Sequence, residues 1–364
     1  MNIKSHVGHR HCLAPRLAAG GSALPIARGV RYLVPAVLLN IALGSVGTAQ
    51  TDSAPGSENP HFVSGLAAAD PDFPGLANLC SMPAGQRGAP PGPPNNAQAE
   101  DQDERRLPSG PPATRVFDNL IFLGHERVSA WAVETSDGLI LIDALNNPEE
   151  AEFFIENGLA SLGLDPVDIR IMLISHGHGD HYAGGRYLQE KYGMEVVMSA
   201  VDWEMLSSGD TGFNVAGWAE NIPDVDRTVH DERDAIVLGD TTLELVVTPG
   251  HTMGTITTII TVKDGDNTHL AALWGGTGFN FEPDTWQFLA YATSAERMRA
   301  EVLERGMEVF LSNHVRRDQS DRRIELLKER QPGDAHPFLL SSERLARGFQ
   351  VFRDCALGRA TMQL

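Results

Sequence analysis

The stretch Ser175-His176-Gly177-His178-Gly179-Asp180-His181 places three imidazoles and one carboxylate within six residues, directly after the apolar run 171–174. A short turn after a buried strand can direct several side chains into one cleft, and imidazole with carboxylate is a ligand set that Zn²⁺ prefers. The stretch therefore predicts a metal site on a strand-to-helix turn, with enough ligands for two ions.

The spacing within this cluster gives the ligands two directions. His176 and His178 are two residues apart, so both point the same way on an extended segment, and Asp180 repeats that phase while His181 begins the next element. The alternative is a set of exposed loop histidines, such as a nonspecific nickel-binding tract. Such tracts do not usually follow a buried strand and precede a helical segment like 187–190.

Two distant histidines occur in matching contexts. His251 closes the β-rich run 245–250, and His314 closes the run 309–313. Strand ends that meet at one rim of a sheet would bring both imidazoles to the cluster. Taken singly, either histidine would more simply be a structural one. Together with the cluster they are predicted to be metal ligands.

The H-x-H-x-D-H pattern resembles the signature of the metallo-β-lactamase superfamily, and the resemblance extends from about Val116 to about Cys355. It implies two Zn²⁺ ions per chain. It also implies the ligands of each ion, which are His176, His178 and His251 for the first, and Asp180, His181 and His314 for the second.

Departures from two branches of the superfamily narrow this resemblance. Many of its hydrolases, such as glyoxalase II, lactonase and tRNA-processing nuclease relatives, carry a metal-bridging aspartate at the end of one strand. The corresponding stretch of this chain, residues 270–277, holds no carboxylate. The lactamases of the cysteine-containing subclass place a thiolate there, and this chain has no cysteine between Cys80 and Cys355. What remains is a subclass B3-like pattern. Turn positions are expected for Asp264, Asp266 and Asp284.

The order of predicted elements gives the fold class. Strands are expected at 116–124, 129–133, 139–143, 195–199, 240–251, 255–262 and 269–274, and helices at about 148–163, 293–305, 319–330 and 341–355. Strands first meander and then alternate with helices, which favours two mixed sheets with helices on both outer faces. This is an α/β fold, the αββα four-layer sandwich of the resembled family.

Three regions are expected along the chain. Residues 1–50 carry five basic residues, no Asp or Glu, and an apolar run at 33–43 that is short for a membrane span, so they are predicted to be a signal peptide. An uncleaved anchor is the alternative. Residues 51–112 are expected to be a Pro/Gly-rich extension or linker, and residues 113–364 the catalytic domain.

Export to the periplasm or beyond the cell has two consequences. Removal of the signal changes the formal net charge from −19 to about −24, which argues against a nucleic-acid partner, and no stable membrane insertion is expected after cleavage. Cys12 would leave with the signal, so Cys80 and Cys355 are expected to form a disulfide in an oxidising compartment. Two unpaired buried thiols are the alternative.

The chemistry implied by the resemblance is hydrolysis of a small-molecule substrate by a zinc-bound hydroxide, because Zn²⁺ lowers the pKa of its water to about 7. Asp180 would orient that water and manage its proton. The expected bond is the β-lactam amide. Another ester, lactone or amide on the same scaffold is the alternative, and a non-catalytic periplasmic zinc-binding protein is a third.

Three residues are candidates for substrate contact. Gly276 and Thr277 lie where B3 enzymes use serine hydroxyls to bind the lactam carboxylate, and Trp218 lies in a segment expected at the rim, although packing is the alternative for this ring. The turn 125–127 is a further rim element. Three remaining histidines are expected at the surface, namely His230, His269 and His336.

Overall fold

The computed structural model describes residues 59–81 and 107–363, except residues 211, 214 and 282. The predicted signal peptide (1–50) and most of the predicted linker lie outside the described residues. In the part of the chain that is described, none of the helices combines the length and the apolarity that a membrane span requires.

The first sheet has seven strands in sequential order from β1 to β7. These strands are β1 (Thr114–Phe117), β2 (Leu120–Gly124), β3 (Ser129–Thr135), β4 (Gly138–Ile142), β5 (Ile169–Leu173), β6 (Glu195–Ser199) and β7 (Arg227–Val229). Strands β1 to β4 are antiparallel, whereas β4 to β7 run parallel. The carboxyl ends of the parallel strands therefore share one edge, where sites of α/β proteins are usually built.

The second sheet has five strands in the order β12-β11-β10-β9-β8. These strands are β8 (Arg233–Leu238), β9 (Thr241–Val247), β10 (Ile256–Asp264), β11 (Asn267–Trp274) and β12 (Val309–Ser312). Only the β11–β12 pair is parallel. Gly265 and Asp266 form the turn of the β10–β11 hairpin, which confirms the turn position of Asp266, whereas Asp264 is the last residue of β10 and pairs with Asn267.

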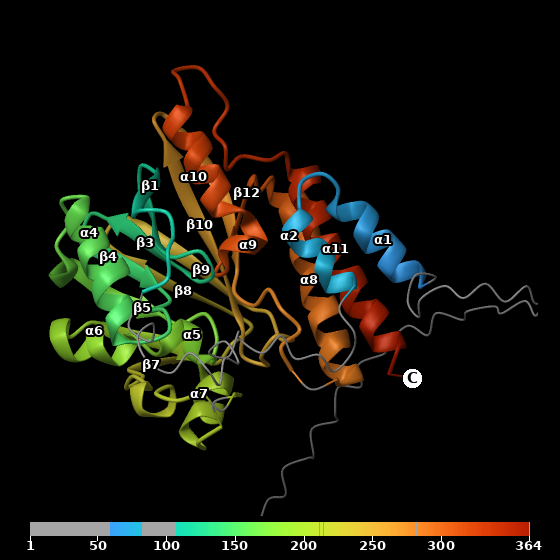
Figure 1. Cartoon of the computed structure of the whole chain (residues 1–364), viewed down its shortest axis with the longest axis horizontal. Helices are drawn as coiled ribbons and strands as arrows, with labels where there is room; N and C mark the ends of the chain where they lie inside the picture. Colours follow the sequence, from blue (N-terminus) through green and yellow to red (C-terminus); the bar gives the residue numbers. More distant parts are fainter. Residues whose placement is uncertain (1–58, 82–106, 211, 214, 282, 364) are drawn as a thin grey trace, which may run out of the picture. The chain divides into compact units, whose positions relative to one another are not determined.

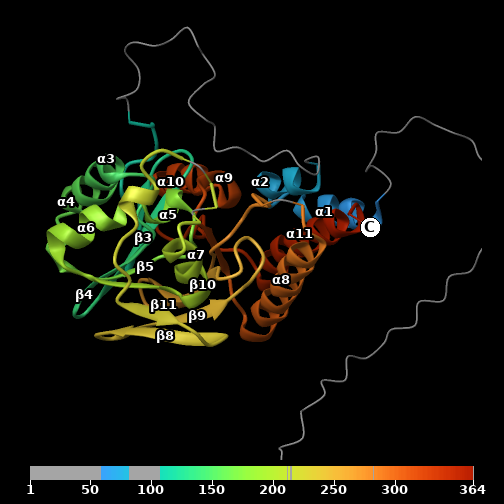
Figure 2. The same ribbon diagram turned by 90° about the horizontal axis from the view of Figure 1, so that it is seen from below.

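Helices cover the outer faces of both sheets, as Figures 1 and 2 show. The α-helices are α1 (Pro60–Ala69), α2 (Pro74–Ala77), α3 (Pro148–Glu150), α4 (Asn157–Ser161), α5 (Gly179–Tyr182), α6 (Gly185–Tyr192), α7 (Ala200–Ser207), α8 (Thr285–Arg305), α9 (Val315–Asp318), α10 (Ser320–Glu329) and α11 (Ser342–Thr361). A π-helical segment, η2 (Ala151–Glu156), joins α3 to α4. The short 3₁₀ helices are η1 (Asn78–Cys80), η3 (Pro166–Asp168) and η4 (Ala219–Asn221).

Three apolar clusters account for the layers. The central cluster, which includes Trp131, Leu245 and Ile260, lies between the two sheets. A second cluster packs α4 and α6 on the seven-stranded sheet, and a third packs α8 and α11 on the five-stranded sheet. Burial of each large apolar side chain contributes about 1.5–3 kcal/mol, so the stacked layers are the main stabilising element. The predicted αββα sandwich with two mixed sheets is confirmed.

Several predicted boundaries were wrong. The single strand expected at 116–124 is a hairpin, because Asp118 and Asn119 form its two-residue turn and the Asn119 side chain hydrogen-bonds to Thr261 and Lys263 of β10. Helix α8 begins eight residues earlier than the predicted 293, since Asp284 caps its first turn through the N–H of Gln287.

Helices were not predicted in the N-terminal extension. Within it, α1 and α2 pack against α11 (Figure 2). The structure also joins Cys80 to Cys355 in a disulfide. The Asp72 carboxylate also pairs with Arg344 and Arg347 of α11. Residues 60–80 of the predicted extension therefore pack with the helical layer that contains α11.

Loss of the Cys80–Cys355 bond should destabilise the fold. The bond spans 275 residues, and constraining so long a loop in the unfolded chain is worth about 2–4 kcal/mol. We expect Cys80→Ser/Cys355→Ser to lower Tm by several degrees in calorimetry. A reductant should lower the Tm of the wild type similarly and leave that of the double variant unchanged. An unchanged wild-type Tm under reduction would contradict this expectation.

Candidate metal centre

The histidine cluster lies on the turn between β5 and α5. His176 and His178 follow the buried strand, and His181 lies within α5, which begins at Gly179. Gly179 is required because a Cβ atom there would lie 1.9 Å from the ring of Trp218. The turn can therefore approach the underlying layer closely enough to direct its side chains inward.

Three ring nitrogens of the first ligand group converge on one point. His176 Nε2, His178 Nδ1 and His251 Nε2 lie 3.0–3.1 Å from one another. Nitrogens bound to zinc at about 2.0–2.1 Å in a tetrahedron lie about 3.3 Å apart, so the triangle has nearly the size of a metal site. All three side chains are at most 5% exposed. The structure thus brings together the three residues predicted for the first ion.

Hydrogen bonds on the opposite ring edges orient two of these imidazoles. His251 Nδ1 lies 2.8 Å from the carbonyl oxygen of Gly278, which can only accept, so the proton is on Nδ1 and Nε2 carries a lone pair. His176 Nδ1 lies 3.1 Å from Ser175 Oγ, which donates its own proton to Asp143. Both Nε2 lone pairs therefore face the centre of the triangle, as a metal requires.

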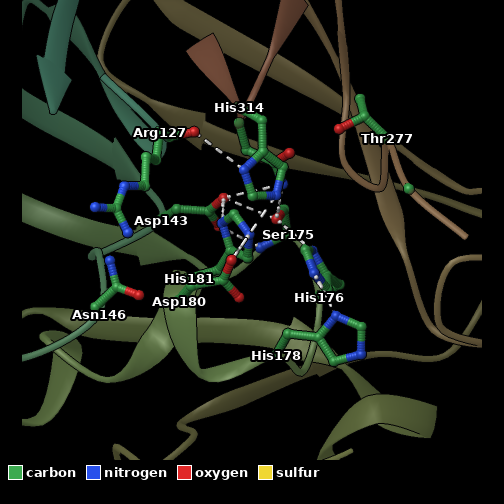
Figure 3. A network of polar contacts seen from close by, with 12 residues as sticks. Arg127, Asp143, Asn146, Ser175, His176, His178, Asp180, His181, Thr277 and His314 are labelled. Atoms are coloured by element: carbon green, nitrogen blue, oxygen red, sulfur yellow. Dashed lines mark hydrogen bonds and ion pairs between the residues drawn. The ribbon is translucent and has the colours of Figure 1, made fainter. Parts of the chain in front are cut away.

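A second group that could hold a metal ion lies beside the first and consists of His176, Asp180 and His181, with the predicted ligand His314 next to it (Figure 3). His181 Nδ1 is 2.9 Å from Asp143 Oδ2, while its Nε2 is buried and lacks a hydrogen-bond partner among the described residues. Asp180 Oδ2 lies 3.4 Å from that Nε2 and 3.8 Å from His314 Nε2. The predicted second set is thus gathered at one place, more loosely than the first.

Burial and neighbouring charges prepare these groups for a cation. Burial lowers the pKa of His178 and of His314 to about 4, and it also holds the pKa of His176 and His251 below the usual value. Burial opposes protonation of His181 too, but the carboxylates of Asp180 and Asp143 raise its pKa to about 10. The first group is therefore neutral at pH 7, whereas the second attracts positive charge.

Comparisons with known proteins agree with this geometry. The family model described as metallo-beta-lactamase superfamily matches residues 123–262, which hold five of the six predicted ligands. Residues 123–262 therefore belong to the metallo-β-lactamase superfamily. The fold and the histidine-rich site are those of a metal-dependent hydrolase of this superfamily.

Solved structures show the same fold. FEZ-1 metallo-β-lactamase from Legionella gormanii is 22% identical with a TM-score of 0.59, over 71% of this chain and 98% of that one. BJP-1, a subclass B3 metallo-β-lactamase of Bradyrhizobium japonicum, is 23% identical with a TM-score of 0.57, over 72% of this chain and 99% of that one.

Curated relatives share only part of their length with this chain. A hydroxyacylglutathione hydrolase of Chelativorans sp. (strain BNC1) is 31% identical over 87 residues, which are 24% of this chain and 28% of that protein. The exodeoxyribonuclease WalJ of Streptococcus pneumoniae (strain ATCC BAA-255 / R6) is 30% identical over 80 residues, 22% of this chain and 28% of that protein. The matches thus span about a quarter of each relative.

Sequence reasoning missed Asp143, which follows β4 and organises this superfamily site. Its Oδ1 accepts the Ser175 N–H at 2.7 Å, and its Oδ2 accepts from Ser175 Oγ at 2.8 Å and from His181 Nδ1 at 2.9 Å. The residue is fully buried, with φ of 65°. An aspartate at the end of the strand paired with β5 was the signal that could have identified it.

Asp202 in the first turn of α7 was also missed. Its Oδ2 accepts the Gly177 N–H at 2.8 Å and the Thr252 hydroxyl at 2.6 Å, and its Oδ1 accepts the Gly254 N–H at 2.9 Å. Burial raises the pKa of Asp202, although these donors oppose that shift. One carboxylate thus ties the loop of His176 and His178 to the loop of His251.

The residues predicted to contact substrate are buried. Thr277 and Trp218 are 0% and 4% exposed, and Trp218 packs under Gly179, which supports the packing alternative for this ring. Figure 3 shows Thr277 apart from the ligands. The Gly276 carbonyl accepts from Tyr291, and a Cβ at Gly276 would lie 2.4 Å from that of His251. Substrate contact by these three residues stays a prediction.

The expectation that three other histidines lie at the surface was correct only for His230, which is exposed. His336 is buried, stacks on Phe117 with ring centroids 4.1 Å apart, and bonds to the Val116 carbonyl. His269 is half-buried in β11 and pairs with Glu308. An aromatic neighbour and a carboxylate from distant segments explain these two positions.

Replacement of Asp143 by asparagine should weaken metal binding to the group that contains His181. The amide NH₂ would donate to His181 Nδ1, which moves the ring proton to Nε2 and removes the metal-facing lone pair. We expect a loss of 10-fold or more in affinity at this group, with the first group nearly unchanged.

Competition titration against a chromogenic chelator measures both affinities. Asp168→Asn, at a half-exposed carboxylate paired with Arg170, is the matched control. Equal weakening at both groups, or none, would contradict the assigned tautomer.

Proposed function

We propose that the chain is an exported dinuclear zinc hydrolase, subclass B3-like, that opens the β-lactam amide. The observation that carries the proposal is the composition of the second ligand group. It gathers Asp180, His181 and His314, while the end of β11 continues as Gly275-Gly276 with neither a carboxylate nor a thiolate. The solved lactamases with the same fold support this proposal.

Zinc fits the donor atoms of both groups. Imidazole nitrogens with one carboxylate suit its borderline softness, and the buried His181 Nε2, which lacks a hydrogen-bond partner among the described residues, would bind the ion once it gives up its proton. We assign His176, His178 and His251 to one ion and Asp180, His181 and His314 to the other. When bound, zinc lowers the pKa of water and polarises a carbonyl group.

The protein's own contribution is to hold the ligands and to move a proton. His181 lowers the pKa of Asp180 well below its usual range, although burial acts in the opposite direction. Asp180 is therefore ionised at neutral pH. With Oδ2 facing the two histidines, its other oxygen accepts the hydrogen bond of the attacking water and carries the proton toward the leaving nitrogen.

The second candidate is hydrolysis of another ester, lactone or amide on this scaffold. The hydroxyacylglutathione hydrolase relatives favour this candidate, whereas the histidine-rich second group favours the lactamase. A non-catalytic zinc-binding protein is the least favoured because all six ligands are gathered. The nuclease relatives do not alter the expected lack of a nucleic-acid partner, since the chain carries a net charge of −19.

Export to the periplasm or medium is part of the proposal. The Cys80–Cys355 bond supports it, because disulfides persist in oxidising compartments. The partner we expect there is a small-molecule substrate, with no stable membrane insertion once the signal is removed.

The deciding experiment is hydrolysis of a chromogenic cephalosporin and of a carbapenem by the mature, zinc-loaded chain. We expect turnover that a chelator abolishes and that Asp180→Ala lowers by 100-fold or more, because general acid–base catalysis typically contributes 10²–10⁴-fold. A protein that holds two zinc ions yet turns over neither compound would redirect the assignment to lactones and esters.

Metal content tests the ligand assignment separately. His181→Ala and His314→Ala should each lower the zinc content from two ions per chain to about one, because each removes one ligand of the second group. Elemental analysis after dialysis measures this, and His230→Ala, at an exposed histidine outside the site, is the control. Two retained ions in either ligand variant would refute the assignment.

A further inference from the structure

The tight turn between β2 and β3 holds Arg127 beside the second ligand group. The turn closes with the His125 N–H bonded to the Val128 carbonyl at 3.0 Å, which leaves Glu126 and Arg127 at its tip. The Arg127 carbonyl accepts from His314 Nδ1 at 3.2 Å. The backbone of this arginine therefore touches a predicted metal ligand.

A buried pair beneath the turn fixes its other side. His125 is 1% exposed, its Nδ1 accepts the Arg127 N–H at 3.4 Å, and its Nε2 lies 3.2 Å from the buried Glu150 carboxylate. The Asn146 side chain donates to the same carboxylate at 2.7 Å. Both backbone polar groups of Arg127 are thus occupied, which fixes the place from which its side chain extends.

The guanidinium itself is available to a ligand. The Arg127 side chain is 50% exposed, and the ion pair recorded for it among the described residues joins its Nε to Glu126 Oε1 at 3.8 Å, beyond hydrogen-bond distance. Glu126 instead accepts from the Ser109 hydroxyl at 2.9 Å through its other oxygen. Figure 3 shows Arg127 on the side of Asp180 and His314, across the cluster from Thr277.

These contacts suggest which substrate group the site recognises. A guanidinium is a planar fork of N–H donors that matches a carboxylate, and a local cation offsets the repulsion that a chain of net charge −19 exerts on an anion. Thr277, predicted to replace the serine hydroxyls, is 0% exposed. Arg127, whose side chain is half exposed, is therefore better placed than the buried Thr277 to bind an anion.

We propose that Arg127 binds a carboxylate of the substrate, so that this site takes carboxylate-bearing amides and discriminates against their neutral analogues. The inference rests on the proposed hydrolytic function for its substrate. Recognition of the anion by the turn 125–128 is a separate property, and it can be measured without turnover.

The kinetic test compares a chromogenic cephalosporin with the methyl ester of its ring carboxylate. We expect Arg127→Ala to raise KM for the acid about tenfold with kcat within about twofold, and to leave KM for the ester unchanged, since only the acid loses a charge-assisted contact. Arg127→Lys should recover part of the loss because it keeps the charge without the fork. The matched control is Arg170→Ala, whose side chain is 51% exposed.

The binding test uses calorimetric titration of 3-mercaptopropionate and of its methyl ester into the metal-loaded protein. The wild type should bind the acid more tightly, and Arg127→Ala should lose that preference with its metal content unchanged. If cephalosporins are not hydrolysed but this preference appears and vanishes as expected, the carboxylate site stands while the lactamase proposal fails. Equal effects of Arg127→Ala on acid and ester, or an acid preference that survives it, would overturn the inference.

Discussion

A buried carboxylate at the end of β4 holds the metal centre together. Asp143 accepts two hydrogen bonds from Ser175 and one from His181, and the Asn313 side chain that follows β12 donates to Ser175 Oγ at 3.1 Å and to Asp143 at 3.4 Å. Burying one charge costs several kcal/mol, whereas each hydrogen bond to it contributes about 1.5–3 kcal/mol. The network is therefore stable only when all of its hydrogen bonds are made. It links residues that follow strands of both sheets, and it thereby fixes the orientation of the His181 ring.

The converging imidazoles impose a second constraint. Three ring nitrogens that face one another at 3.0–3.1 Å cannot all hydrogen-bond among themselves once their outer edges carry the protons. A cation is the natural partner for such lone pairs, so metal binding and local folding are linked. The Asp202 carboxylate supports this arrangement because it bonds to the loops of His176 and His251 together. Contacts within the protein thus hold the loops that carry the ligand triangle.

The N-terminal helices and the β2–β3 turn support the side of His314. Arg317 in α9, three residues after this histidine, donates to the Gly75 carbonyl of α2 at 2.8 Å, and the disulfide ties η1 to α11. On the opposite side, the Arg127 carbonyl bonds to the His314 ring. The looser second group is therefore bounded by elements far apart in the sequence, and the Arg127 guanidinium lies at its rim.

The sequence by itself determined the ligand types, their order and the layered fold. His176, His251 and His314 each follow an apolar run. Such runs can be recognised locally in the sequence, and they are strands of the two sheets in the αββα sandwich. Only the tertiary structure decided the roles of Asp143 and Asp202, and it placed Arg127 of the predicted rim turn beside His314. Aspartates near strand or helix ends and an arginine in a turn are common in any sequence, and their meaning depends on which distant N–H groups and imidazoles the folded chain brings to them. Helices α1 and α2 could not be predicted from the sequence either. Their stability comes from contact with α11 rather than from a periodic pattern of their own.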